Sequence, residues 1–225
     1  MKVKNDFNLT GVLFDLDGVL LDTEGTYTEF WSAVERRYPT GIDNFAHRIK
    51  GSNLATILDT YFPGAELQRE VTEMLDRFQA GMEYRFFPGA LELLDSLAAE
   101  GIPACLVTSS DRLKMEAVYG QHLDFRRRFA DVVTGDMVTR PKPDPQCFRL
   151  GAERLGIDIG HCVVIEDSLN GLRAGRASGA RVIGLTTTCT AAEVEPLCDR
   201  CLPTIAAVTP AIIRLTVDCL SRNFL

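Results

Sequence analysis

Histidine is scarce in this 225-residue sequence, which contains only His47, His122 and His161. None of them accompanies a G-x-S-x-G elbow, so a Ser-His-Asp hydrolase is disfavoured. The G-x-x-x-x-G-K-[ST] loop of P-loop NTPases is also missing. The chemistry of this chain therefore has to come from other side chains.

Basic residues are outnumbered by acidic ones, and long apolar runs are absent from the sequence. The 24 lysines and arginines stand against 31 aspartates and glutamates, a net charge of −7, which disfavours nucleic acid and anionic membranes as partners. No stretch reaches the roughly 18 apolar residues that span a bilayer, and the first ten residues show no secretory signal. We expect a cytoplasmic protein, and a monomer because no long apolar stripe is left over.

The seven cysteines are an odd number and are scattered along the chain. Cys198-Asp199-Arg200-Cys201 has the spacing of a redox or zinc motif. A zinc site would need a second pair of ligands at comparable spacing, and none is evident. We interpret these two cysteines as packing residues.

Short apolar runs alternate with helical patterns, which is typical of a parallel sheet covered on both faces. Continuous apolar runs such as Cys162-Val163-Val164-Ile165 favour strands that are buried on both sides. The predicted strands are 11–17, 102–108, 131–134, 161–167, 180–185 and, more weakly, 202–208. The predicted helices of this part are 90–99, 112–123, 145–155 and 168–178. The fold class is therefore α/β, with a Rossmann-like parallel sheet.

The rhythm changes after the first strand, where only helical periodicity is found. Tyr27, Phe30, Trp31 and Val34 have the i, i+3, i+4, i+7 spacing of a packed helix face. We therefore predict an all-helical cap domain inserted into the core. Its boundaries divide the chain into core 1–22, helical cap 23–87 and core 88–225, and its two short connections would let it move as a lid.

The most informative motif is Asp15-Leu16-Asp17-Gly18, directly after an apolar strand. Residues two apart on a strand point the same way, so both aspartates should face one pocket at the carboxyl end of the strand. Open α/β sheets bind their ligands there. Two neighbouring carboxylates repel each other unless they share a cation or a proton.

A second acidic pair, Glu166-Asp167, ends another apolar run. If this strand lies beside the first, four carboxylates converge at one edge of the sheet, a set of oxygen ligands that suits Mg²⁺. Acidic residues at a helix start also stabilise the helix N-terminus. Alone, the pair is as consistent with a helix cap as with a site.

Two further segments follow strands. Thr108-Ser109-Ser110 precedes a helix, where hydroxyls and free N–H groups form a phosphate cradle, although Ser110 or Asp111 could serve only as a cap. Lys142, held between two prolines, would bind a phosphate dianion if it lies beside the carboxylates. A lone loop lysine is usually solvated, so the surrounding motifs decide its interpretation.

In this order the four segments resemble the haloacid dehalogenase-like (HAD) phosphatase superfamily, and the chain is most similar to its β-phosphoglucomutase-like and sugar phosphatase subgroup. The helical insertion resembles the C1-type cap of that superfamily. The resemblance implies that Asp15 attacks phosphorus and that Asp17 acts as general acid and base. It also implies that Asp15, the backbone carbonyl of Asp17 and Asp167 hold Mg²⁺, with Glu166 assisting.

The resemblance also implies how the substrate is bound. Thr108, the Ser109 backbone and Lys142 would hold the phosphoryl group, and Lys50-Gly51 would reach the active site from the cap. The expected activity is hydrolysis of a small phosphorylated metabolite, a sugar phosphate, through an aspartyl-phosphate.

Two alternatives stay open. A β-phosphoglucomutase carries a His where this chain has Tyr27 and an Arg where it has Leu54, which favours hydrolysis over mutase activity. The other alternative is a non-catalytic protein that binds a phosphometabolite. A binder would not need a nucleophile and its acid together, and this chain has both Asp15 and Asp17. Dehalogenation is set aside because dehalogenases lack the acid at the position of Asp17.

Overall fold

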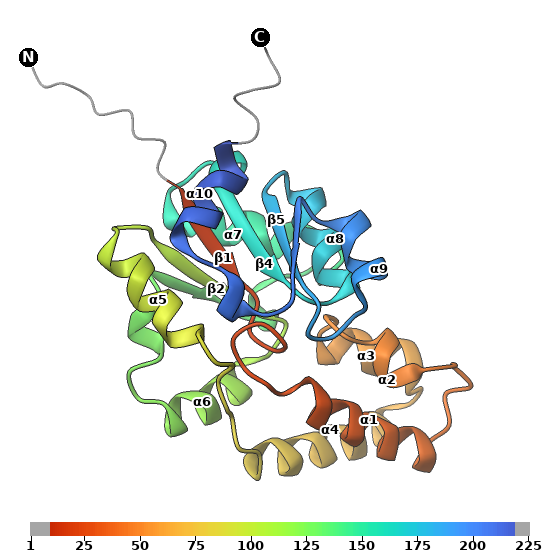
Figure 1. Cartoon of the computed structure of the whole chain (residues 1–225). Coiled ribbons are helices and arrows are strands. Elements are labelled where there is room, and N and C mark those ends of the chain that lie inside the picture. Colours follow the sequence, from red (N-terminus) through yellow and green to blue (C-terminus); the bar gives the residue numbers. More distant parts are fainter. Residues whose placement is uncertain (1–9, 219–225) are drawn as a thin grey trace, which may run out of the picture.

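The computed structural model describes residues 10–218, and its centre is a six-stranded parallel sheet (Figure 1). The strand order is β3-β2-β1-β4-β5-β6. Strand β1 (Gly11–Phe14) lies between β2 (Ala104–Val107) and β4 (Cys162–Glu166), so the three strands that precede the predicted motifs are neighbours. The predicted α/β fold with a Rossmann-like parallel sheet is confirmed.

The remaining elements follow the alternation expected from the sequence. The other strands are β3 (Asp131–Val133), β5 (Arg181–Leu185) and β6 (Arg200–Leu202). The helices are α1 (Glu24–Arg37), α2 (Phe45–Arg48), α3 (Leu54–Tyr61), α4 (Ala65–Ala80), α5 (Ala90–Ala99), α6 (Arg112–Gln121), α7 (Gln146–Leu155), α8 (Leu169–Ser178), α9 (Ala191–Val194) and α10 (Pro210–Asp218).

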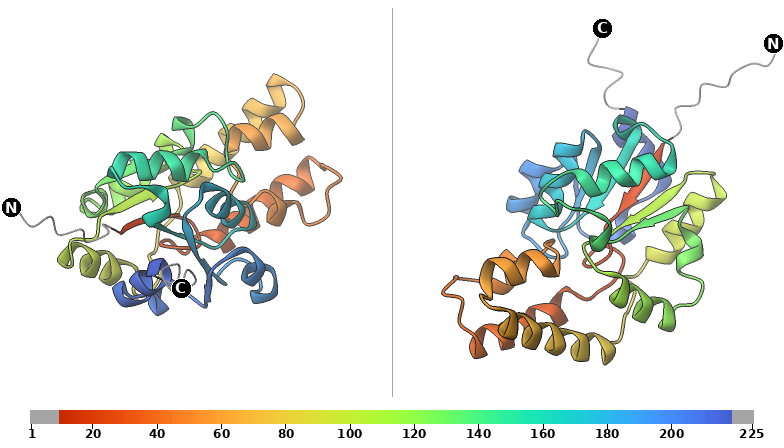
Figure 2. Two further views of the ribbon diagram at one scale, coloured as in Figure 1. Left: turned by 90° about the horizontal axis from the view of Figure 1, so that it is seen from above. Right: turned by 180° about the vertical axis from the view of Figure 1, so that it is seen from behind.

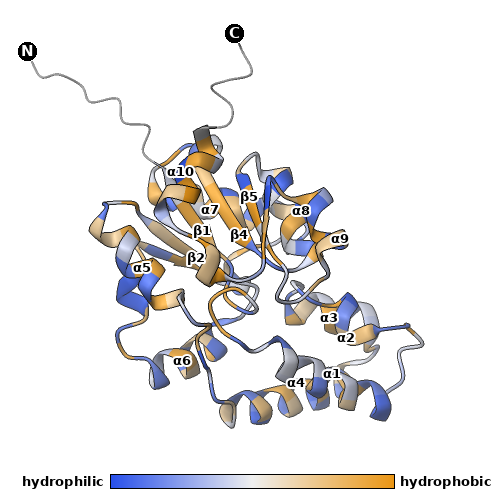
Figure 3. Ribbon diagram, viewed as in Figure 1, coloured by the Kyte–Doolittle hydropathy of each residue, from blue (hydrophilic) through white to orange (hydrophobic). Residues whose placement is uncertain are grey.

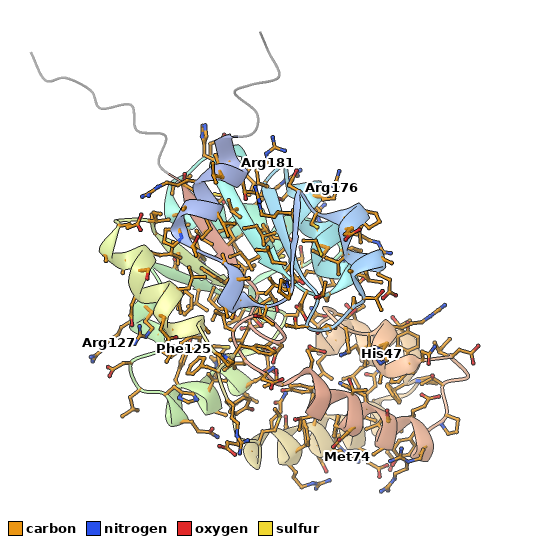
Figure 4. All side chains as sticks on the ribbon, in the orientation of Figure 1. His47, Met74, Phe125, Arg127, Arg176 and Arg181 are labelled. Atoms are coloured by element: carbon orange, nitrogen blue, oxygen red, sulfur yellow. The ribbon has the colours of Figure 1, made fainter. Side chains whose placement is uncertain are left out.

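Helices cover both faces of the sheet, as the views in Figure 2 show. Side chains alternate across strand β1, so Val12 and Phe14 join an apolar cluster with α5, α6 and α10. Leu13 points the other way and packs with α7 and α8. Strand β1 and most of β4 are apolar, whereas the covering helices carry a polar outer face (Figure 3). Phe125, labelled in Figure 4, is 1% exposed, and its ring packs against those of Phe86 and Phe129.

Helices α1 to α4 form a separate group at the carboxyl ends of the strands (Figure 1). They have an apolar cluster of their own, in which Trp31 contacts Phe45 and Phe62. The chain enters and leaves this group side by side, because Asp22 N donates to the Arg85 carbonyl at 2.8 Å. We call residues 24–80 the helical segment; its status as a cap with the boundaries 23–87 stays a prediction.

The last strand was placed wrongly. Strand β6 is Arg200–Leu202, whereas the prediction was 202–208, because Pro203 follows the strand and a single 3₁₀ turn, Ile205–Ala207, comes next. Helix α10 was missed. Cys198 and Cys201 are free and pack against the apolar cluster of α7 and α8, as interpreted, while Cys219 and both chain ends of the predicted core lie outside the described residues. Within residues 10–218, no helix combines the length and the apolar character needed to cross a membrane.

Candidate active site

Asp15 lies where strand β1 ends, and the sheet itself fixes its position. Its backbone N–H donates to the Ile165 carbonyl of β4 at 3.0 Å. Lys142 is 3% exposed and places its Nζ 2.5 Å from Asp15 Oδ1 and 2.8 Å from Glu166 Oε1. Burial raises the pKa of Asp15 to about 8, against the opposing effect of the Lys142 ammonium. The structure thus brings Asp15, Lys142 and Glu166 together as the motifs predicted.

Asp17 does not share a cation with Asp15. Its two carboxylate oxygens each lie 2.6 Å from Lys114 Nζ, and they also accept hydrogen bonds from Thr23 Oγ1 and Ser110 Oγ. Burial is the largest influence on the pKa of Asp17 and raises it, but the Lys114 ammonium and the hydrogen bonds from Lys114, Thr23 and Ser110 together bring this pKa below its ordinary value. The repulsion expected between the two carboxylates is therefore relieved by two separate lysines.

Sequence reasoning missed Lys114. It lies in the first turn of α6, is 4% exposed, and its Nζ is 4.3 Å from the centre of the Tyr27 ring. In the sequence Arg112-Leu113-Lys114 reads as an ordinary surface turn of a helix. The only available signal was its position three residues after Asp111, whose side chain caps the helix by accepting from Lys114 N at 2.9 Å.

Glu166 is fully buried, and both of its carboxylate oxygens already accept hydrogen bonds. Oε1 accepts from Lys142, and Oε2 accepts from the backbone N–H groups of Asp167 and Ser168, both at 2.8 Å. A Cβ on Gly171 would lie 1.6 Å from Glu166 Oε1, so this carboxylate needs a glycine in helix α8. The N-cap of that helix is Ser168, so neither Glu166 nor Asp167 caps it, and both acidic residues belong to the site.

Asp167 is the one carboxylate of this group whose oxygens have no hydrogen-bond partner in the described part of the chain. It is 1% exposed, and both Oδ1 and Oδ2 are buried. Burial, and next the charge of Glu166, raises its pKa well above the ordinary value. A buried carboxylate without a partner is a costly arrangement that a bound cation would relieve.

The predicted metal ligands only partly converge. Among residues 10–218, no three His, Cys, Asp or Glu side chains are arranged as a ready metal site. The reason is that Lys142 lies between Asp15 and Glu166, and that Asp17 turns its carboxylate to Lys114. The residues nevertheless fit a hard cation, because the buried, unpartnered Asp167 faces the same cavity as Asp15.

The predicted substrate-binding residues form a connected rim. Thr108 is buried and its Oγ1 accepts from Ser110 N at 3.0 Å. Ser109 Oγ donates to the Gly51 carbonyl of the helical segment at 2.7 Å. Asn170 Nδ2 donates to the Lys50 carbonyl at 3.0 Å. The loop at 50–52 is therefore joined to the sheet part of the molecule by side chains from two motifs.

A cavity of about 480 Å³ lies between the strand ends and the helical segment. Asp15, Asp17, Thr108 and Asp167 line one side of it, and Trp31, Ile57 and Leu75 line the other. Lys50 also lines the cavity, and its Nζ is 2.6 Å from Glu24 Oε2. Both side chains of this ion pair are largely buried, at 10% and 18% exposure.

A cavity with several carboxylates in its wall, at the carboxyl edge of an open parallel sheet, lies where α/β enzymes bind their ligands. The family model described as haloacid dehalogenase-like hydrolase matches residues 9–179, and the chain belongs to this family. The match confirms the family that the motifs resemble and its enzyme class, a hydrolase.

Three relatives show the range of similarity. Hexitol phosphatase A of Escherichia coli (strain K12) is 34% identical over 181 residues, which are 78% of this chain and 82% of that protein. The bifunctional riboflavin kinase/FMN phosphatase of Arabidopsis thaliana is 34% identical over 131 residues, but the match covers 58% of this chain and 35% of that protein. The crystal structure of CbbY from Rhodobacter sphaeroides with phosphate has a TM-score of 0.72 at 26% identity and covers 92% of this chain and 99% of that one.

Proposed function

We propose that this chain is a Mg²⁺-dependent phosphatase that hydrolyses a small phosphorylated metabolite, a sugar phosphate, through an aspartyl-phosphate on Asp15. The observation that carries the proposal is the position of Asp15 in the cavity wall, 2.5 Å from the buried Lys142 and in the same cavity as the unpartnered Asp167. The phosphatase names of the relatives support it.

The phosphoryl group would be bound by Lys142, Thr108 and the backbone at Ser109. Lys142 is held in place, because its ammonium contacts both Asp15 and Glu166. A fixed cation beside the nucleophile holds a phosphate dianion and offsets charge in the transition state. Asp15 then attacks phosphorus, the P–O bond to the alcohol breaks, and water later hydrolyses the acyl phosphate.

Asp17 would carry out both proton transfers of this reaction: it would protonate the leaving alcohol and then deprotonate the attacking water. Its carboxylate is bound to Lys114, Thr23 and Ser110 in this structure, so it has to turn toward the phosphate to do so. Both Asp15 and Asp17 line the same cavity, which makes this a rotation of one side chain.

Mg²⁺ would be held by Asp15, the backbone carbonyl of Asp17 and Asp167. It would supply positive charge for the phosphoryl oxygens and for Asp167. Glu166 would orient Lys142 rather than bind the metal, since both of its oxygens already accept hydrogen bonds. The helical segment would act as a cap that excludes water, with Lys50 and Gly51 on the cavity side.

Gly18→Ala should weaken Mg²⁺ binding. Gly18 has a φ of 78°, and a Cβ there would lie 1.9 Å from Asp167 Oδ2, so Asp167 has to shift. Changes to the groups that surround and orient a metal ligand typically lower metal affinity by about 10- to 100-fold. We expect the Mg²⁺ concentration for half-maximal activity to rise by this factor.

Gly101→Ala is the matched control, because Gly101 has a φ of 68° and open space around its Cβ position. It has the same backbone strain, about 1–2 kcal/mol, without touching the site. An unchanged Mg²⁺ requirement in Gly18→Ala would contradict the role of Asp167 as a ligand.

Release of inorganic phosphate from a panel of phosphorylated sugars and sugar alcohols, with Mg²⁺ or with EDTA, tests the proposed function. We expect release that needs Mg²⁺ and returns when Mg²⁺ is restored. No release from any compound would overturn it. The mutase alternative would then be tested with β-glucose 1-phosphate and a bisphosphate primer, and the binding alternative by calorimetry.

A further inference from the structure

We propose that the cavity selects phosphate monoesters whose leaving group carries no second negative charge, a class that includes neutral sugars and sugar alcohols and leaves out bisphosphates and phosphorylated acids. The inference rests on the proposed function for the site of cleavage. It concerns the part of the same cavity that the helical segment lines, where the leaving group would lie.

The charge of the cavity wall is the first observation. Its carboxylates belong to Asp15, Asp17, Glu24, Asp111, Asp136 and Asp167. Its ammonium groups belong to Lys50 and Lys114. No arginine or histidine of residues 10–218 lines it. Negative groups therefore outnumber positive ones in the wall of the cavity as a whole, and Glu24 adds a carboxylate from the helical segment.

Both lysines in the cavity wall already form ion pairs with carboxylates. Lys114 contacts both oxygens of Asp17 at 2.6 Å, and Tyr27 covers it. Lys50 lies 2.6 Å from Glu24 Oε2 in an ion pair that is largely buried. Lys142 stands behind Asp15, where it serves the transferred phosphate. A second anion on the substrate would have to break one of these pairs to find a cation.

Such a break would leave a carboxylate beside the incoming anion. Two like charges a few ångströms apart in a partly desolvated cavity repel strongly. Discrimination of this kind arises from the repulsive element rather than from better contacts to the preferred substrate. Because Glu24 holds Lys50 within the helical segment, the Glu24–Lys50 pair is the element that we expect to reject a distal negative charge.

An uncharged leaving group meets no such obstacle. Thr28 and Gln79 line the cavity near Tyr27 and offer hydrogen-bonding groups to hydroxyls, and Gln79 Nε2 already donates to Tyr27 at 3.1 Å. Trp31 and Leu75 provide apolar surface for the carbon chain. This part of the cavity therefore suits a neutral, hydroxylated carbon skeleton.

Sorbitol 6-phosphate and 6-phosphogluconate test the inference, because these linear compounds differ only at C1, a hydroxymethyl group against a carboxylate. Both are measured at pH 7.5 with Mg²⁺, as substrates and as competitors of p-nitrophenyl phosphate hydrolysis. We expect the neutral compound to have a kcat/KM, or an inhibition constant, more favourable by about tenfold or more.

Variants of the ion pair locate the selectivity. Glu24→Gln frees Lys50. The ratio of kcat/KM for sorbitol 6-phosphate to kcat/KM for 6-phosphogluconate should therefore fall toward one. Lys50→Met leaves Glu24 without its partner, so the preference for the neutral compound should grow. Glu83→Gln removes an equivalent charge from an exposed pair with Arg85 outside the cavity and should leave the preference unchanged.

The outcomes separate the inference from the proposed function. Hydrolysis of p-nitrophenyl phosphate with equal use of both compounds, or a preference for the acid, overturns the inference and leaves the function standing. The inference also fails if Glu24→Gln keeps the full preference. If nothing is hydrolysed, the function fails, and calorimetric binding of the two compounds decides the inference: tighter binding of the neutral one supports it, while equal binding or none overturns it.

Discussion

Asp15→Asn should abolish phosphate release while the protein stays folded. The carboxylate is the proposed nucleophile, and an amide of the same shape cannot form the acyl phosphate. We expect a loss of at least about three orders of magnitude in kcat. Burial raises the pKa of Asp15 to about 8, so its charge is not what stabilises the fold. The melting temperature should therefore be equal to that of the wild type or higher.

Asp22→Asn is the matched control, because it makes the same chemical change on an exposed residue of the same segment. It should keep both activity and stability. Near-normal turnover by Asp15→Asn would contradict the mechanism. A folded but inactive variant with a normal melting temperature, measured on the same preparation as phosphate release, would support it.

Lys114→Met should destabilise the protein by about 3 kcal/mol at neutral pH. The substitution leaves the Asp17 carboxylate without its buried partner, which is more damaging than removing both charges. The pKa of Asp17 is below its ordinary value of 3.8, so the stabilisation from this pair is present above pH 3.8 and is lost as the pH falls through the lower folded value. The difference between wild type and variant should shrink in acid.

Urea unfolding at several pH values measures this effect, and the double variant Lys114→Met/Asp17→Asn provides the internal test. Removing the second charge should restore part of the lost free energy of unfolding. Arg112→Met on the same helix removes an exposed charge and should change stability by less than about 1 kcal/mol. Equal effects of Lys114→Met and Arg112→Met would show that the buried pair does not stabilise the fold.

The order of the strands in the sheet could be anticipated only in part. Apolar runs such as Val12-Leu13-Phe14 predicted buried strands because a strand covered on both faces has no polar side. Nothing local states that β1 pairs with both β2 and β4, since parallel pairing depends on packing between segments about 90 and 150 residues apart. The placement of the second acidic pair beside Asp15 depended on that pairing.

The last strand and the final helix show the same limit. Local pattern placed a strand at 202–208, but the edge of the sheet pairs Gly184 with Cys201 and ends at Leu202. Helix α10 packs on β4 and β5, and some of its apolar side chains are buried because they lie against that face of the sheet. Edge elements depend on what they pack against, so their boundaries are weakly encoded in local sequence.

The sequence by itself determined the chemistry available to this protein: the acidic motifs at Asp15 and Glu166, the lysine at 142 and the family that their order resembles. Each follows from residue type and short spacing, because an apolar strand delivers the next side chain to the sheet edge. Only the tertiary structure decided the partners of the charges. It paired Asp17 with Lys114 and Glu24 with Lys50, because a buried charge takes whichever counter-charge the packing brings within reach, whatever the distance in sequence.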